Sequence, residues 1–154
     1  MEMYAVFNIG NSTVQMGLAC GKALNDVTAL PLTTFVDRLE TEGASFLPEL
    51  LRDRPSRVAS VVPRASAVLE KACDGQNLPS FVSVHELDGW DFSYVDAASL
   101  GADRLANVAA ARGYGHLPAI VVDCGTAITF EVVDSAGCLR GGSIMLGRGS
   151  MYKA

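Results

Sequence analysis

The chain has 154 residues, enough for one domain or slightly more with a core of its own. Apolar residues make up 49% and charged residues 19%, which excludes a disordered or fibrous protein. Seventeen acidic residues against 12 basic ones give a net charge of −5, and Lys and Arg form no run. We therefore expect no direct nucleic-acid partner.

Membrane and disulfide signals are weak. No segment reaches the roughly 18 uninterrupted apolar residues of a membrane span, and the first residues lack the pattern of a signal peptide. We expect a cytoplasmic protein with no membrane partner. The spacing of the four cysteines shows neither a CxxC pair nor a zinc pattern, which favours reduced thiols, although disulfides stay formally open.

The first third of the chain predicts three strands and then a helix. The strands are expected at residues 3–8, 12–19 and 24–32, the first two joined by a tight Gly-Asn turn. Thr33 or Thr34 is expected to cap a helix that runs towards Arg52. Gly43 and Pro48 interrupt its pattern, which predicts a kink or two shorter helices.

The remainder alternates between strands and helices before it ends in strands. A helix is expected at 101–112, with Leu105, Val108 and Ala109 on its apolar face. Residues 85–100 are irregular, which is more typical of a binding loop than of a linker. The other predicted elements are a strand at 57–62 stopped by Pro63, a helix at 64–72, and strands at 81–84, 118–123, 127–134 and 138–145.

One local pattern occurs twice. Residues 8–12 (Asn-Ile-Gly-Asn-Ser) and 123–127 (Asp-Cys-Gly-Thr-Ala) each follow an apolar run and precede another strand-like run. Such turns can direct backbone N–H groups, a hydroxyl and a carboxylate at a phosphate and its metal ion. The repeat suggests two related half-domains that face each other across a nucleotide cleft.

This order of elements is similar to the opening of each half of an actin-like ATPase. We expect an α/β protein of this sugar-kinase-like, ribonuclease H-like fold, with a first half at 1–117 and the start of a second half at 118–154. A three-stranded apolar sheet without a covering layer cannot stand alone. Either a partner covers the second sheet, or the chain is a truncated version of a longer protein.

Five motifs in order resemble the type III pantothenate kinases, the family that includes the Bvg accessory factors. Five ordered matches are far more specific than a single one. They are residues 8–12, Ser-Val-Val-Pro at 60–63, Tyr94 with Gly-Ala-Asp-Arg at 101–104, residues 123–129, and Gly-Gly-Ser-Ile at 141–144 with Gly147 and Met151.

The resemblance implies transfer of a phosphoryl group from ATP to pantothenate in coenzyme A synthesis. It implies Asp103 as the catalytic base and Asp123 as the magnesium ligand. It also implies a monovalent cation, potassium or ammonium, and a homodimer. The expected pantothenate-binding residues are Tyr94, Gly101 and Arg104, and the expected ATP-phosphate residues are Asn8, Gly10, Asn11, Ser12, Gly125 and Thr126.

The sequence also departs from the family pattern. Asn8 stands where the family has an Asp that orients magnesium, and Glu131 stands where it usually has Asp. An amide keeps the shape of the carboxylate but loses its charge. This substitution motivates an alternative function, a catalytically impaired relative that acts as an accessory or transcriptional regulatory protein. A third hypothesis, an actin-like phosphotransferase with another acceptor, rests on fold analogy alone.

Overall fold

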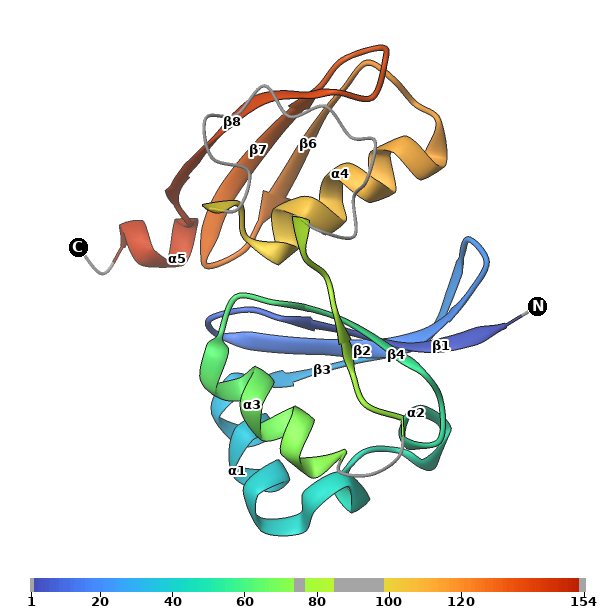
Figure 1. Cartoon of the computed structure of the whole chain (residues 1–154). Helices are drawn as coiled ribbons and strands as arrows, with labels where there is room; N and C mark the ends of the chain where they lie inside the picture. The colour runs from blue at the N-terminus through green and yellow to red at the C-terminus, as the bar shows by residue number, and fades with distance from the viewer. Residues whose placement is uncertain (1, 74–76, 85–98, 153–154) are drawn as a thin grey trace. The chain divides into compact units, whose positions relative to one another are not determined.

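The computed structural model describes residues 2–73, 77–84 and 99–152 (Figure 1). The chain forms two compact units, Met1–Val82 and Ser83–Ala154. The division falls before the boundary expected after residue 117. Helix α4 (Ala102–Tyr114) belongs with the strands that follow it, because it packs on β6 (Ala119–Cys124) and β7 (Ala127–Val133).

The first unit is built on a mixed five-stranded sheet in the order β3-β2-β1-β4-β5. β1 pairs antiparallel with β2 and parallel with β4, β2 pairs antiparallel with β3, and β4 pairs parallel with β5. The three strands predicted at the start are confirmed. The strands are β1 (Met3–Ile9), β2 (Thr13–Cys20), β3 (Ala23–Pro31), β4 (Ser56–Ser60) and β5 (Ser80–Phe81).

Three helical segments follow β3 and β4. They are α1 (Leu32–Glu42) with the 3-10 turn η1 (Gly43–Phe46), α2 (Glu49–Arg52) and α3 (Pro63–Ala72). The predicted interruptions are confirmed, since Gly43 ends α1 with a φ of 60°. The predicted Thr cap is wrong: α1 begins at Leu32, whose amide donates to the Ser12 carbonyl oxygen, 2.9 Å. Strand pairing continues to Pro31, so the helix starts too early for either threonine to cap it.

The core of the first unit lies between one face of the sheet and the helices α1 and α3 (Figure 1). Phe35 of α1 and Leu69 of α3 are almost completely buried. They lie in one cluster with Ile9, Val14 and Val58, each of which directly follows an exposed residue in its strand. Burial of these apolar side chains supplies the main stabilisation of this half.

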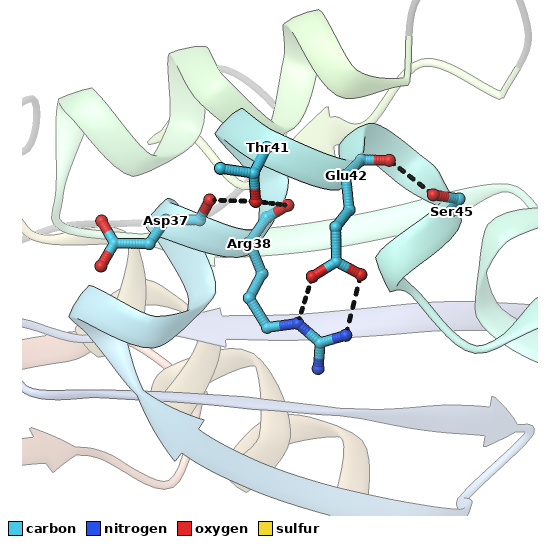
Figure 2. A network of polar contacts seen from close by, with 5 residues as sticks. All are labelled: Asp37, Arg38, Thr41, Glu42 and Ser45. Atoms are coloured by element: carbon cyan, nitrogen blue, oxygen red, sulfur yellow. Dashed lines mark hydrogen bonds and ion pairs between the residues drawn. The ribbon is translucent and has the colours of Figure 1, made fainter.

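Polar contacts close the end of α1 (Figure 2). The Arg38 guanidinium donates two hydrogen bonds to the Glu42 carboxylate, at 2.7 and 2.9 Å. These bonds lower the pKa of Glu42. The Ser45 hydroxyl donates to the Glu42 carbonyl oxygen, and the same guanidinium lies 4.2 Å from the centre of the Phe46 ring. The pair therefore joins α1 to the turn that follows it.

The second unit is an antiparallel sheet, β6-β7-β8, with α4 on one face. β8 spans Leu139–Leu146 and precedes the short helix α5 (Arg148–Met151). Arg104, Leu105 and Val108 are the buried residues of α4, whereas Ala109 is exposed and does not belong to the predicted apolar face. The expectation of a sheet without any covering layer is corrected, because α4 covers one side of it.

The structure also bears on the membrane and disulfide expectations. No helix within the described ranges is long and apolar enough to cross a membrane. All four cysteines are free, at positions 20, 73, 124 and 138. Burial raises the pKa of the Cys73 thiol, which disfavours its reactive thiolate form.

The turn between β7 and β8 is organised by Asp134. Its Oδ1 accepts the backbone N–H groups of Ala136 and Cys138, both at 2.9 Å, and its Oδ2 accepts Arg140 Nε at 2.6 Å. The Cys138 amide, then the Arg140 guanidinium and the Ala136 amide, lower the pKa of Asp134. The ionised form is therefore the one that the folded hairpin prefers.

The Asp134→Asn variant tests this linkage. A lowered folded-state pKa contributes stability above the pKa of the unfolded chain, about 3.9, and loses it as the pH falls through the folded-state value. We expect a lower Tm for the variant at neutral pH and a gap to wild type that closes below about pH 4. Thermal unfolding across pH measures this gap, with Asp37→Asn, an exposed acid on α1, as the control. A constant gap down to about pH 2.5 would contradict the assignment.

Candidate functional site

The first polar turn joins β1 to β2 in the first unit. The Gly10 amide donates to the Thr13 carbonyl oxygen at 3.0 Å, and Asn11 and Ser12 are exposed at the tip. Asn8 is exposed, lies opposite Gln15 in the strand register, and has its Nδ2 3.4 Å from Gln15 Oε1. The structure therefore brings the predicted residues 8, 10, 11 and 12 together at one end of the hairpin.

The second polar turn joins β6 to β7 in the second unit. The Gly125 amide donates to the Ala127 carbonyl oxygen at 2.8 Å, and the Gly147 amide donates to the Thr126 carbonyl oxygen at 3.0 Å. A Cβ at Gly147 would collide with the carbonyl oxygens of Gly125 and Thr126. Gly147 thus lets the end of β8 close tightly against this turn.

The two turns place their polar residues in equivalent positions. Asn8 is the penultimate residue of β1, and Asp123 is the penultimate residue of β6. Each pairs with a polar residue of the next strand, Asn8 with Gln15 and Asp123 with Thr129. The repeat seen in the sequence is therefore a repeat of structure, with an amide in the first copy and a carboxylate in the second.

The start of α4 carries the predicted catalytic base and two of the predicted pantothenate-binding residues. Gly101 is the N-cap in an extended conformation, and Asp103 lies in the first turn. Asp103 Oδ1 accepts the Arg104 backbone N–H at 2.8 Å, so this carboxylate helps to satisfy the helix terminus. Tyr94, which is also predicted to bind pantothenate, lies outside the described residues.

Arg104 enters a buried polar network that the sequence did not predict. Its Nε donates to Glu131 Oε1 at 2.8 Å and its Nη2 to the Phe130 carbonyl oxygen at 3.3 Å. Asn107 Nδ2 lies 3.5 Å from Glu131 Oε2. Arg104 is 8% exposed and Glu131 is 0% exposed. A buried carboxylate needs such partners, because an unpaired charge in the interior is costly.

In the sequence, Glu131 stands out only as a departure from the family pattern. A usable signal is nevertheless present: Glu131 lies on the same face of β7 as Thr129 and Val133, the face that the structure buries. An acid at a core position implies a cation nearby. Identifying Arg104 as that cation requires knowing that α4 packs over β7.

A metal would find a limited donor set here. Within the described ranges, no group of three or more His, Cys, Asp or Glu side chains is arranged to hold an ion. Mg²⁺ in phosphoryl-transfer sites commonly takes one or two carboxylates and completes its shell with substrate phosphates and water. Asp123 fits that requirement as a single oxygen ligand. Opposite it, Thr129 Oγ1 is buried without a hydrogen-bond partner among the described residues.

Solved structures with the same arrangement establish the fold. A Campylobacter jejuni protein assigned to the Baf family of transcriptional activators aligns with a TM-score of 0.61 and 21% identity, over 97% of this chain and 57% of that one. An Aquifex aeolicus member of the Ppx/GppA family aligns with a TM-score of 0.54 and 14% identity, over 99% of this chain and 54% of that one. The predicted actin-like ATPase fold is confirmed.

Comparison with sequence relatives identifies the family within this fold. The family model for type III pantothenate kinase matches residues 5–154. The type III pantothenate kinase of Endomicrobium trichonymphae is 33% identical over 163 aligned positions, covering 94% of this chain and 61% of the relative. That of Chlorobaculum parvum is 34% identical over 152, covering 92% and 55%. The chain belongs to the type III pantothenate kinase family, and it spans little more than half the length of these two relatives.

Gly142 tests the packing around Arg104. It pairs with Glu131 across β7 and β8, and a Cβ there would collide with the Phe130 carbonyl oxygen and the Arg104 guanidinium. We expect Gly142→Ala to lower the free energy of unfolding by about 1–3 kcal/mol, the usual cost of overpacking. Denaturant unfolding measures the change.

Gly113→Ala is the matched control, because Gly113 lies in α4 and an added methyl group would have nothing within 4 Å of it. Alanine favours helices, so this variant should gain up to about 1 kcal/mol. Equal effects of the two substitutions would contradict the close approach at Gly142.

Proposed function

We propose that the protein acts as a type III pantothenate kinase, which transfers the γ-phosphoryl group of ATP to pantothenate. The products are ADP and 4′-phosphopantothenate, in the opening step of coenzyme A synthesis. The observation that carries this proposal is the family match along residues 5–154. The chain spans 61% and 55% of the length of two relatives whose names give this activity, so the activity is a proposal and does not follow from the match alone.

Asp103 is the proposed catalytic base. It accepts the proton of the pantothenate hydroxyl as that oxygen bonds to the γ-phosphorus and the bond from phosphorus to the ADP oxygen breaks. Its position in the first turn of α4 supports the role, since the exposed amides of a helix N-terminus favour negative charge nearby. Gly101, at the N-cap, is proposed to allow the substrate a close approach.

Arg104 and Tyr94 complete the proposed acceptor side. Arg104 is proposed to contact the pantothenate carboxylate, for which a guanidinium has the suitable planar geometry. Because the side chain is only 8% exposed and bonds to Glu131 and the Phe130 carbonyl oxygen, this contact would have to form at the edge of the guanidinium, in addition to those bonds. Tyr94 is proposed to line the acceptor pocket. Both assignments come from the family motif at residues 94 and 101–104.

The two polar turns are the proposed phosphate-binding elements. The turn amides and hydroxyls would donate to phosphate oxygens, through Gly10, Asn11 and Ser12 in one turn and Gly125 and Thr126 in the other. Asp123 would hold Mg²⁺, which neutralises charge on the phosphates. The family pattern also leads us to propose a monovalent cation, potassium or ammonium.

A homodimer in the cytoplasm is the proposed state of the protein. The face of the second sheet that points away from α4 is apolar, with Ile120, Val122 and Val132 exposed by 66%, 50% and 40%. Such a contiguous apolar surface is typical of an interface. The longer polypeptide of the relatives is the other candidate to cover it.

Replacing the base tests the reaction. In a coupled assay with ATP, pantothenate, magnesium and potassium, we expect turnover by the wild-type protein. Asp103→Asn should lower kcat by about 10²–10⁴-fold, because the amide cannot accept the proton. Asp37→Asn, an exposed acid on α1, should retain wild-type turnover. No turnover by the wild-type protein at saturating substrates would refute the proposed function.

Asn8 favours a second candidate function, an accessory or regulatory protein without catalysis. Its position is equivalent to that of Asp123 in the repeat, but its amide carries no charge for a metal ion. A protein of this kind would bind neither ATP nor pantothenate in calorimetry and would form a stable complex with another polypeptide.

Restoring the charge distinguishes the candidates. If the enzyme is limited by the missing carboxylate, Asn8→Asp should raise kcat/KM at fixed magnesium by at least about tenfold, the equivalent of about 1.4 kcal/mol of transition-state stabilisation. Asn25→Asp adds the same charge on β3 away from the turn and should leave kcat/KM unchanged. A rise in both variants would point to net charge as the cause.

A further inference from the structure

Glu131 occupies an unusual position for an acid. Its side chain is completely buried on β7, and its carboxylate contacts two residues of α4, Arg104 at 2.8 Å and Asn107 at 3.5 Å. Replacing such a pair by apolar residues is often neutral for stability. Stability alone is therefore a weak explanation for an ion pair at this position.

The sheet provides a fitted slot for the Arg104 guanidinium. Glu131 accepts Nε, the neighbouring Phe130 carbonyl oxygen accepts Nη2, and Gly142 lies opposite Glu131 on β8. A side chain at Gly142 would occupy the space of the guanidinium. A planar guanidinium held by two acceptors in a tight slot has little rotational freedom.

This slot lies one residue away from the proposed base. The Arg104 backbone N–H donates to Asp103 Oδ1 at 2.8 Å, so the two residues share the first turn of α4. At the other end of the helix, Arg112 Nη1 lies 3.5 Å from the Gly137 carbonyl oxygen. The helix is thus anchored to the hairpin at both ends, and the buried anchor is the one beside Asp103.

We propose that Glu131 is a positioning residue for the acceptor substrate. By holding the Arg104 guanidinium in the Gly142 slot, it fixes that side chain in one orientation and with it the α4 turn that carries Asp103, and these are the two groups proposed to meet pantothenate. The inference rests on the proposed kinase function and concerns the pantothenate side of the reaction alone.

Glu131→Gln and Glu131→Asp test the inference in the protein expressed from its complete reading frame. The Gln side chain keeps the size and an acceptor oxygen but loses the charge, whereas Asp keeps the charge with a shorter reach. Small displacements of positioning groups can cost on the order of 100-fold. We expect Glu131→Gln to raise KM and Kd for pantothenate by about 10–100-fold, with Glu131→Asp between it and wild type.

The ATP parameters and a matched variant provide the controls. KM for ATP should change by less than about threefold in both Glu131 variants, because binding energy at other sites is retained. Glu42→Gln makes the same kind of change in an ion pair of similar length in the first unit, on α1, and should keep wild-type affinity for pantothenate. Calorimetry measures both Kd values independently of turnover.

The outcomes separate this inference from the proposed function. Wild-type pantothenate binding with unchanged Kd in both Glu131 variants would overturn the inference alone. Equal losses for ATP and pantothenate that follow the fraction of folded protein would also overturn it, since they indicate a structural role. If Glu131→Gln does not fold, Glu131→Asp decides between these results. A wild-type protein that neither binds nor phosphorylates pantothenate would refute the proposed function and the inference with it.

Discussion

The carboxylate of Glu131 is the constraint on which the second unit depends. It is fully buried at 0% exposure, so the fold must bring a cation to it, and Arg104 of α4 is that cation. The pair lies on the side of the sheet that α4 covers, and it leaves space only for glycine at position 142. The position of Asp103 follows, because it precedes Arg104 in the same helical turn.

The hairpins could be predicted from local sequence, whereas the start of α1 depends on tertiary structure. Strand, polar glycine turn and strand follow one another directly along the chain, over Met3–Cys20 and over Ala119–Val133, so both copies were predictable from alternation and turn residues. The interruptions of the first helix at Gly43 and Pro48 were predictable for the same reason. By contrast, α1 begins at Leu32 because β3 pairs with β2 as far as Pro31, a constraint from a distant strand that the threonines could not reveal.

The candidate site likewise contains residues that the sequence reveals and residues that only the folded structure brings together. The polar turns at residues 8–12 and 123–127, and Asp103 at a helix start, were visible in the sequence as motifs. The network of Glu131, Asn107 and Gly142 was not, because its members meet only when α4 lies on β6 and β7 and β8 pairs with β7. Thr129 belongs to the same class, since its buried hydroxyl has meaning only once Asp123 is known to lie opposite it.

Fold and function rest on different residues in this protein. Structures with 14–21% identity share its architecture, among them one assigned to transcriptional activators and one from the Ppx/GppA family. The hairpins and the core therefore do not select a chemistry. What would select it is the small set of side chains that the shared framework presents: a carboxylate at the start of α4, and an amide or a carboxylate at the penultimate position of β1 and of β6.

The fold tolerates an uncharged residue at one of these two turns, because Asn8 is exposed and pairs through its backbone. Loss of Glu131 would be different in kind, since it would leave the guanidinium of Arg104 without its buried counter-ion.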